Sequence, residues 1–358
     1  MSDDGLEPTA DEQYPAEPYP GVRPGFSHTH LDRTVLPLRA DAGAHAGWRL
    51  AGSGEDLDDW LSAVDAAPMS ARVPVLAYGS NACPGKMTWL RDNLGLAGPV
   101  VALRALCTDV AAVWASGLRK WGTGRPATLA AMPGVAEHHV VWLADQEQVA
   151  VLDVCEGRGS RYDLVRLHSG RVVGEDGTVW ERPLVYTSAA PTRYPLLVDG
   201  RPVRCVDIPH ADAGRLHGEP AKQDGLHVSV VDGSPVADDH PDRLFVYGTL
   251  CPDAPQWSLV EPMVAERPRP ARVRGTLYDT GLGYPALLPG DDGVPGWLLR
   301  LRAPAAALPT LDDYEGEEYR RVRMSTTDGD ACWTYLWDRP VDGMTICPAG
   351  KSGGMLRR

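Results

Sequence analysis

The chain has 358 residues, 43% of them hydrophobic, and a formal net charge of −13. This length is typical of two domains, and the apolar content is sufficient for two cores. The acidic balance argues against nonspecific nucleic-acid binding, which needs a basic surface. No apolar run reaches the roughly 20 residues of a membrane helix, so we expect no membrane partner. The sequence leaves protein partners unknown.

The cysteines indicate a reducing compartment. There are 7 of them, an odd number at irregular spacings. The N-terminus is acidic and Pro-rich and does not resemble a secretion signal. We therefore expect reduced thiols and a cytoplasmic location.

The chain begins with a segment of low apolar content. Residues 1–40 are rich in Pro, Asp, Glu and Gly, and we expect them to form a disordered tail. Residues 55–66 follow as a short amphipathic helix, with Leu57, Trp60, Leu61 and Val64 on one face.

A first domain is expected over residues 71–210 and a second over 243–341, joined by a linker at 211–242 and followed by a loose tail at 342–358. Helices are predicted over 145–155 and 303–314, each stopped by a glycine. The predicted strands are 75–78, 99–113, 140–143, 162–167 and 183–186, then 272–278, 296–301, 319–324 and 331–337. Short strands with one helix per domain favour an α+β fold.

The two predicted domains repeat the same motifs at matched spacing. Tyr78-Gly79-Ser80-Asn81 corresponds to Tyr247-Gly248-Thr249-Leu250, and Leu152 to Gly157 corresponds to Leu311 to Gly316. Pro126 precedes Glu156 by 30 positions, and Pro285 precedes Glu315 by the same 30. Such self-similarity indicates an internal duplication.

The Tyr-Gly turns and the two glutamates are the candidate site residues. A glycine at a strand end allows a sharp bend that gathers backbone N–H groups, although such a glycine is most often a simple turn residue. Glu156 and Glu315 each lie in the last turn of a predicted helix, where the helix dipole disfavours a carboxylate. A raised pKa there would suit general acid/base chemistry, and a solvated surface role is the alternative.

These motifs, in this order, resemble the γ-glutamylcyclotransferase superfamily, which includes the AIG2-like proteins. The second copy is the more similar, and the segments that carry its resemblance are 245–250, 275–278, 284–287, 294–297 and 311–323. The first copy matches through 78–81, 127–129 and 152–162.

The resemblance implies two tandem domains, each a small mixed or antiparallel β-barrel with flanking helices. It implies a metal-independent enzyme without cofactors, in which the α-amine of a γ-glutamyl amide or peptide attacks the γ-carbonyl and releases 5-oxoproline and an amine. Carried over, the catalytic residues are Glu315 and Glu156. The substrate-binding residues are Tyr247, Gly248, Thr249, Leu250 and Tyr319 in the second copy, and Tyr78, Gly79, Ser80, Asn81 and Tyr162 in the first.

Alternatives remain open at this point. The chain could bind a γ-glutamyl or carboxylate ligand without turnover, or combine one active with one regulatory domain. The first copy also carries a basic, aromatic loop without a counterpart in the second, which either recognises an acidic substrate or covers the barrel. The loop consists of Trp114, Arg119, Lys120, Trp121 and Arg125.

Overall fold

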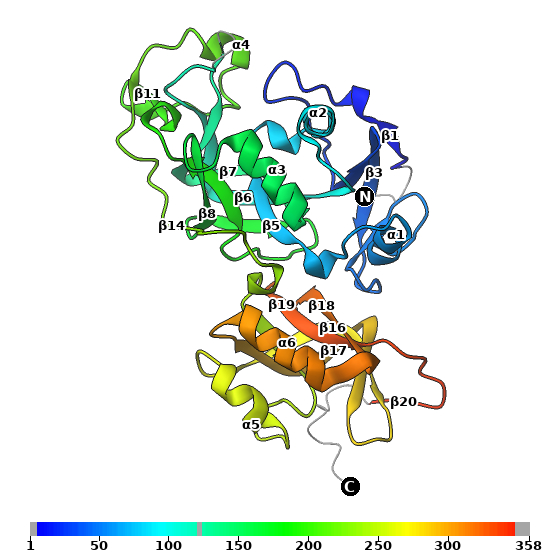
Figure 1. Ribbon diagram of the computed structural model, residues 1–358. Helices are drawn as coiled ribbons and strands as arrows, with labels where there is room; N and C mark the ends of the chain where they lie inside the picture. Colours follow the sequence, from blue (N-terminus) through cyan, green and yellow to red (C-terminus); the bar gives the residue numbers. More distant parts are fainter. Residues whose placement is uncertain (1–5, 120–123, 348–358) are drawn as a thin grey trace. The chain divides into compact units, whose positions relative to one another are not determined.

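The computed structural model describes residues 6–119 and 124–347, and the fold is a mixed α+β arrangement (Figure 1). The chain divides into two compact units. Unit 1 comprises residues 1–38, 72–175 and 180–235, and unit 2 comprises residues 39–71, 176–179 and 236–358. Among the described residues, no helix is long and apolar enough to cross a membrane.

Unit 1 contains one large curved sheet and a separate small sheet in the order β12-β11-β13. Its helices are α2 (Pro84–Leu94), α3 (Gln146–Glu156) and α4 (His210–Ala213). Its strands are β1 (Thr9–Ala10), β2 (His28–Leu31), β3 (Thr34–Ala40), β5 (Val73–Ala77), β6 (Val100–Trp114), β7 (Ala127–Ala144), β8 (Tyr162–Leu167), β9 (Arg171–Gly174), β10 (Leu184–Ser188), β11 (Leu196–Val198), β12 (Arg201–Pro202), β13 (Glu219–Pro220) and β14 (Val228–Val230).

The central strands of unit 1 run in the order β6-β7-β5-β10-β8. Strand β5 is antiparallel to β7 and parallel to β10. Strand β9, which follows β8 in the chain, pairs with β6 at the other end of this order, so the sheet curls on itself. Helix α3 covers one face of this sheet (Figure 1), and Trp114, Trp142 and Leu129 are fully buried in the core.

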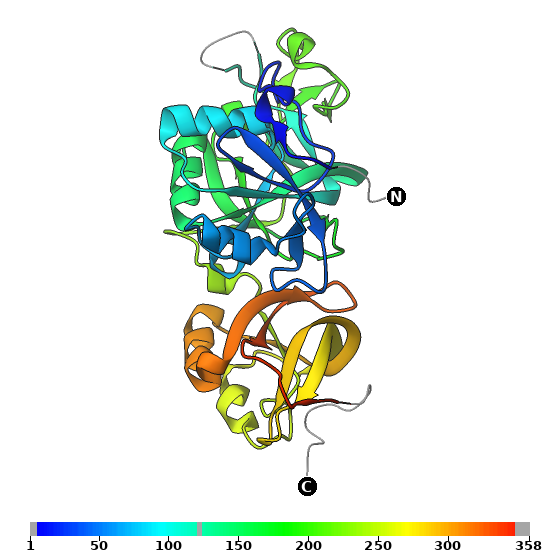
Figure 2. The same ribbon diagram turned by 90° about the vertical axis from the view of Figure 1, so that its right-hand side faces the viewer.

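Unit 2 has a smaller sheet. Its helices are α1 (Leu57–Ala63), α5 (Trp257–Val260) and α6 (Pro304–Glu315). Its strands are β4 (Trp48–Leu50), β15 (Arg243–Val246), β16 (Arg269–Asp279), β17 (Pro285–Arg300), β18 (Tyr319–Ser325), β19 (Ala331–Trp337) and β20 (Thr345–Ile346). Helix α6 lies along one face of the sheet in both views (Figures 1 and 2), where Leu308 and Leu311 pack against Leu244 and Trp333.

The central strands of unit 2 run in the order β16-β17-β15-β19-β18. Strand β15 is antiparallel to β17 and parallel to β19. An isolated bridge between Val273 and Thr326 brings the two ends of this order together, so this sheet also curls into a partial barrel. Strand order and strand directions are thus the same in the two units.

Several predicted elements agree with the structure. Helices α3 and α6 cover the predicted spans to within one residue, and β8 and β19 have the predicted bounds. Helix α2 was missed because Pro84 and Gly85 suggest a loop. Pro84 occupies the first helical turn, where proline needs no N–H partner, and Gly95 ends the helix in the left-handed conformation.

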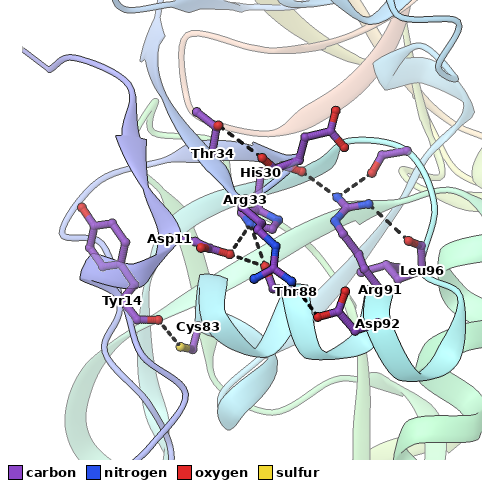
Figure 3. A network of polar contacts seen from close by, with 12 residues as sticks. Asp11, Tyr14, His30, Arg33, Thr34, Cys83, Thr88, Arg91, Asp92 and Leu96 are labelled. Carbon is purple, nitrogen blue, oxygen red and sulfur yellow. Dashed lines mark hydrogen bonds and ion pairs between the residues drawn. The ribbon is translucent and has the colours of Figure 1, made fainter.

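The prediction that residues 1–40 form a disordered tail is wrong for the described part, 6–40. Strand β2 pairs with β3 and β6 inside the unit 1 sheet. A buried polar cluster fixes the segment on α2, in which Asp11 contacts both His30 and Thr88 (Figure 3). Arg33 adds an ion pair with Asp92 (Figure 3). The composition concealed this order because the segment is held by tertiary contacts and not by its own apolar content.

The expected linker and tail also differ from the structure. Within 211–242, strand β14 pairs with β8 and belongs to the unit 1 sheet. Within 342–358, strand β20 pairs with β16, while residues 348–358 lie outside the described part. Backbone pairing with a neighbouring strand supplies the order that the Gly- and Asp-rich composition did not suggest.

Two candidate ligand cavities

Unit 2 contains a cavity of about 240 Å³ where β15 ends, beside the C-terminus of α6. It brings together all the candidate residues predicted for the second copy. Its lining residues are Phe245, Val246, Tyr247, Gly248, Thr249, Leu250, Tyr284, Pro285, Tyr314, Glu315, Glu318, Tyr319 and Tyr335.

Glu315 is the last residue of α6, and its side chain lines this cavity while half-buried. The helix ends there because Gly316 adopts a φ of 67°, which L side chains rarely adopt. Burial raises the pKa of the Glu315 carboxyl to about 7. A carboxyl group with that pKa can both accept and donate a proton near neutral pH.

The turn after β15 lines the same cavity. The Tyr247 hydroxyl donates to the Tyr335 carbonyl at 2.7 Å, and the Thr249 hydroxyl lies 3.2 Å from the Tyr314 hydroxyl. Gly248 lies close to its neighbours: a Cβ there would lie 3.1 Å from the Pro285 ring, which would have to move slightly to admit it. The counterpart Gly79 has an ordinary φ of −100°, so close approach, not a left-handed backbone, explains the glycine.

Tyr319 begins β18 and closes the side of the unit 2 cavity. Its hydroxyl donates to the Pro285 carbonyl at 2.7 Å, and its ring meets Trp337 edge-to-face at 5.2 Å. Burial raises the pKa of the Tyr319 hydroxyl, so it remains protonated at neutral pH.

Unit 1 contains a cavity of about 440 Å³ in the corresponding place, at the end of β5 and the C-terminus of α3. It brings together all the candidate residues predicted for the first copy. Its lining residues are Tyr19, Leu76, Ala77, Tyr78, Gly79, Ser80, Asn81, Lys86, Trp89, Leu94, Arg119, Pro126, Ala127, Val154, Cys155, Glu156, Arg161, Tyr162, Tyr186 and Arg193.

Glu156 is the last residue of α3, which Gly157 ends in the left-handed conformation. The Asn81 amide donates to the Glu156 carboxylate at 2.6 Å. Burial raises the pKa of Glu156, while the Asn81 hydrogen bond and nearby cations oppose that shift. Leu250 occupies the place of Asn81 in the second motif and is buried in the apolar core, so Glu315 lacks this amide.

The tyrosines of the two cavities make equivalent hydrogen bonds. Tyr78 donates to the Tyr186 carbonyl at 2.7 Å, as Tyr247 does to Tyr335. Tyr162 donates to the Ala127 carbonyl at 2.9 Å, and Ala127 opens β7 as Pro285 opens β17. Tyr162 and Tyr319 therefore share a contact although they follow their glutamates at different offsets.

A second pair of contacts was missed in the sequence. Tyr186 donates to the carboxylate of Asp153 at 2.6 Å, and Tyr335 donates to Asp312 at 2.8 Å. Each bond ties the helix that carries the glutamate to the sheet. The aspartate recurs in both Leu-Asp motifs, so the repeat itself contained the signal.

The N-terminal segment supplies residues to the unit 1 site that the sequence did not indicate. Tyr19 is buried against the cavity, where the Ala127 N–H donates to its hydroxyl at 2.9 Å. Arg23 donates to the carbonyls of Tyr78 and Gly79 at 2.7 and 3.0 Å, which fixes the turn.

The basic, aromatic loop has more than one role. Arg119 lines the cavity and lies over the Tyr19 ring at 4.9 Å. Trp114 is a fully buried core residue, and buried Arg125 donates to backbone carbonyls of Ala213 and Leu216. Lys120 and Trp121 lie outside the described residues.

Over residues 6–119 and 124–347, no three His, Cys, Asp or Glu side chains are grouped to hold a metal ion. His28 and His30 are both buried in β2, and His30 belongs to the Asp11 cluster.

Comparison with known proteins defines the class. A sequence model of the family described as "Gamma-glutamyl cyclotransferase, AIG2-like" matches residues 244–351. The gamma-glutamylcyclotransferase family protein YtfP of Citrobacter rodentium is 39% identical over 75 residues, which are 21% of this chain and 63% of that protein. BH1612 of Halalkalibacterium halodurans, named for the same family, is 37% identical over 87 residues, which are 22% of this chain and 78% of that protein.

The solution structure of YtfP from Escherichia coli is 31% identical, with a TM-score of 0.24, and the match covers 30% of this chain and 93% of that chain. By its sequence matches, this chain belongs to the gamma-glutamylcyclotransferase family, through a region of about a hundred residues in unit 2. It spans slightly less than two thirds of the Citrobacter protein it matches, 63% of its length.

Proposed function

We propose that unit 2 is a γ-glutamylcyclotransferase with Glu315 as its general acid and base. The observation that carries the proposal is the half-buried carboxyl at the end of α6, whose pKa burial raises to about 7, in a cavity that the Tyr247 to Leu250 turn also lines. Membership of the family in the same region supports the assignment.

The proposed reaction is an intramolecular aminolysis. Glu315 takes a proton from the α-ammonium of a γ-glutamyl amide, and the amine then attacks the γ-carbonyl carbon. Collapse of the tetrahedral intermediate breaks the C–N bond, and Glu315 returns the proton to the leaving nitrogen. The ring nitrogen then gives up its second proton to the released amine. The products are 5-oxoproline and an alkylammonium ion, and no oxidant or cofactor enters the balance.

The protein must mainly fold the substrate into the attack geometry, because an intramolecular reaction already has a large effective molarity. A cavity of about 240 Å³ suits a folded γ-glutamyl group and part of its leaving amine. The backbone N–H groups of Gly248 and Thr249 are assigned to the developing oxyanion, and protonated Tyr319 to the substrate wall.

We further propose that unit 1 is a second copy with Glu156 in the same role. The shared strand order, the matched tyrosine hydrogen bonds and the paired Asp153 and Asp312 contacts support this reading. The alternative is a unit 1 that only binds, and the hydrogen bond from Asn81 to Glu156 favours it.

The test is release of 5-oxoproline from a panel of γ-glutamyl amides and peptides. We expect Glu315→Gln to remove the unit 2 activity and Glu156→Gln the unit 1 activity. Glu317→Gln, on a 96% exposed neighbouring side chain, is the matched control for Glu315, and Glu147→Gln in the first turn of α3 is the control for Glu156. Unchanged turnover in either test variant contradicts the role of that glutamate.

A further inference from the structure

The charges that line the two cavities are opposite. Four cationic side chains and one carboxylate line the unit 1 cavity: Lys86, Arg119, Arg161, Arg193 and Glu156. Among the described residues that line the unit 2 cavity, the ionisable acids are Glu315 and Glu318, and none is Lys or Arg. Every substrate of this reaction carries the same γ-glutamyl group. The difference in lining charge therefore discriminates between substrates through their leaving part.

All four cations have a contact within the protein: Arg193 donates to the Thr192 carbonyl at 3.4 Å, and Lys86 is hydrogen-bonded to the Cys155 thiol. Arg161 donates to the carbonyls of Glu156 at 3.0 Å and Cys155 at 2.7 Å, which satisfies the C-terminus of α3. Arg119 lies 3.7 Å from Glu17, whose side chain is 71% exposed, so this ion pair is weak.

Arg193 and Lys86 are the cations best placed for a ligand. Arg193 lies over the Tyr162 ring at 5.7 Å, and its buried Nε has no hydrogen-bond partner among the described residues. A buried guanidinium nitrogen without a partner is costly, and an anionic ligand would satisfy it. Lys86 lies over the Trp89 ring at 3.4 Å. The positive charges of Lys86 and Arg193 both act to lower the pKa of the Glu156 carboxyl.

The cavity also has room for more than a γ-glutamyl group, at about 440 Å³ against about 240 Å³ in unit 2. We propose that the unit 1 cavity takes γ-glutamyl compounds whose leaving part carries a second anionic group, with Arg193 and Lys86 as its counter-charges. The unit 2 cavity, lined by Glu318 and tyrosines, takes compounds whose leaving amine carries no negative charge. This inference rests on the proposed function.

The test uses a matched pair, γ-glutamyl-alanine and γ-glutamyl-alanine amide, which differ by one carboxylate. In the intact chain carrying Glu315→Gln, we expect kcat/KM to favour the carboxylate at least tenfold. In the chain carrying Glu156→Gln, we expect the amide to be favoured. Ratios near one in both variants, with 5-oxoproline still released, overturn the inference and leave the proposed function standing.

Arg193→Gln and Lys86→Gln locate the preference. Each variant, in the Glu315→Gln background, should raise KM for the carboxylate several-fold and reduce the ratio between the two compounds. Arg171→Gln removes an equal charge from an exposed position of β9 and should leave the ratio intact. A preference that survives Arg193→Gln and Lys86→Gln together contradicts the assignment of these counter-charges.

Absence of 5-oxoproline from both compounds overturns the proposed function instead. The inference is then decided by calorimetric titration of the same pair into the chain carrying both Glu156→Gln and Glu315→Gln. Tighter binding of the carboxylate, weakened by Arg193→Gln and by added salt, supports it. Equal binding of the two compounds overturns it.

Discussion

The two cavities have the same strand order and matching tyrosine hydrogen bonds, but the surroundings of their glutamates differ. In unit 2, Glu315 is half-buried among tyrosines, and its pKa rises to about 7 through burial alone. In unit 1, Glu156 accepts a hydrogen bond from Asn81 and lies among cations that oppose the rise in its pKa. A common backbone geometry can thus hold two carboxyl groups with different hydrogen-bond partners and different surrounding charge.

The largest expected effect separates the two activities. Glu315→Gln should lower 5-oxoproline release by unit 2 about 10²-fold or more, because it removes the group that moves the proton. The measurement is steady-state turnover in a Glu156→Gln background, with Glu317→Gln as control. A loss below tenfold would indicate that Glu315 only binds the substrate. It would contradict the proposal that the two glutamates have the same catalytic role.

The same substitution should stabilise the protein at alkaline pH. The folded pKa of Glu315, about 7, lies above the unfolded value near 4.5, so the folded state loses stability as pH rises from about 4.5 to above 7. Because the side chain is partly exposed, we expect Glu315→Gln to gain about 1–2 kcal/mol at pH 8. The gain should nearly vanish at pH 5. Urea unfolding at both pH values measures this gain in stability. A gain that does not change with pH would contradict the raised pKa of Glu315.

The hydrogen bonds from Tyr186 and Tyr335 to the helix aspartates should contribute similarly to the free energy of unfolding in the two units. Tyr335→Phe removes the donor to Asp312, and Tyr186→Phe removes the donor to Asp153. Each should lower the free energy of unfolding by about 1–2 kcal/mol, as expected for hydrogen bonds to charged groups. Denaturant unfolding of the two variants, with Tyr278→Phe on β16 as control, sharpens the comparison. A loss of stability in only one of the two variants would show that α3 and α6 are attached to their sheets by different contacts.

The smallest expected effect concerns Asn81. Asn81→Ala removes the hydrogen bond that stabilises the Glu156 carboxylate, so the pKa of Glu156 should rise further. The ascending limb of the pH–kcat/KM profile for unit 1 should move to higher pH, measured in the Glu315→Gln background. Asn93→Ala, on exposed α2, is the control. A shift toward lower pH is incompatible with this role for Asn81.

The repeat made much of this arrangement predictable. Its spacing placed Glu156 and Glu315 at helix ends beside the glycine turns, because the same chain geometry brings the same positions to one end of a sheet. It also contained Asp153 and Asp312, although their partners Tyr186 and Tyr335 follow no shared spacing that would reveal the bond.

The rest depended on contacts distant in sequence. Tyr19 and Arg23 belong to a segment whose composition indicates disorder, yet Tyr19 lines the unit 1 cavity and Arg23 holds its glycine turn. Arg193 follows Pro191 in a short 3-10 turn and carries no motif that would mark it as cavity-lining. Such residues are recognised only once the fold brings them to the site.

The most direct test of the account is 5-oxoproline formation by the intact chain and by the chain carrying both Glu156→Gln and Glu315→Gln. The panel should include γ-glutamyl-alanine and its amide, with the product identified by mass spectrometry. The account predicts release by the intact chain and none above the uncatalysed rate by the double variant. Equal release by both chains, or none from any compound with the intact chain, would contradict it.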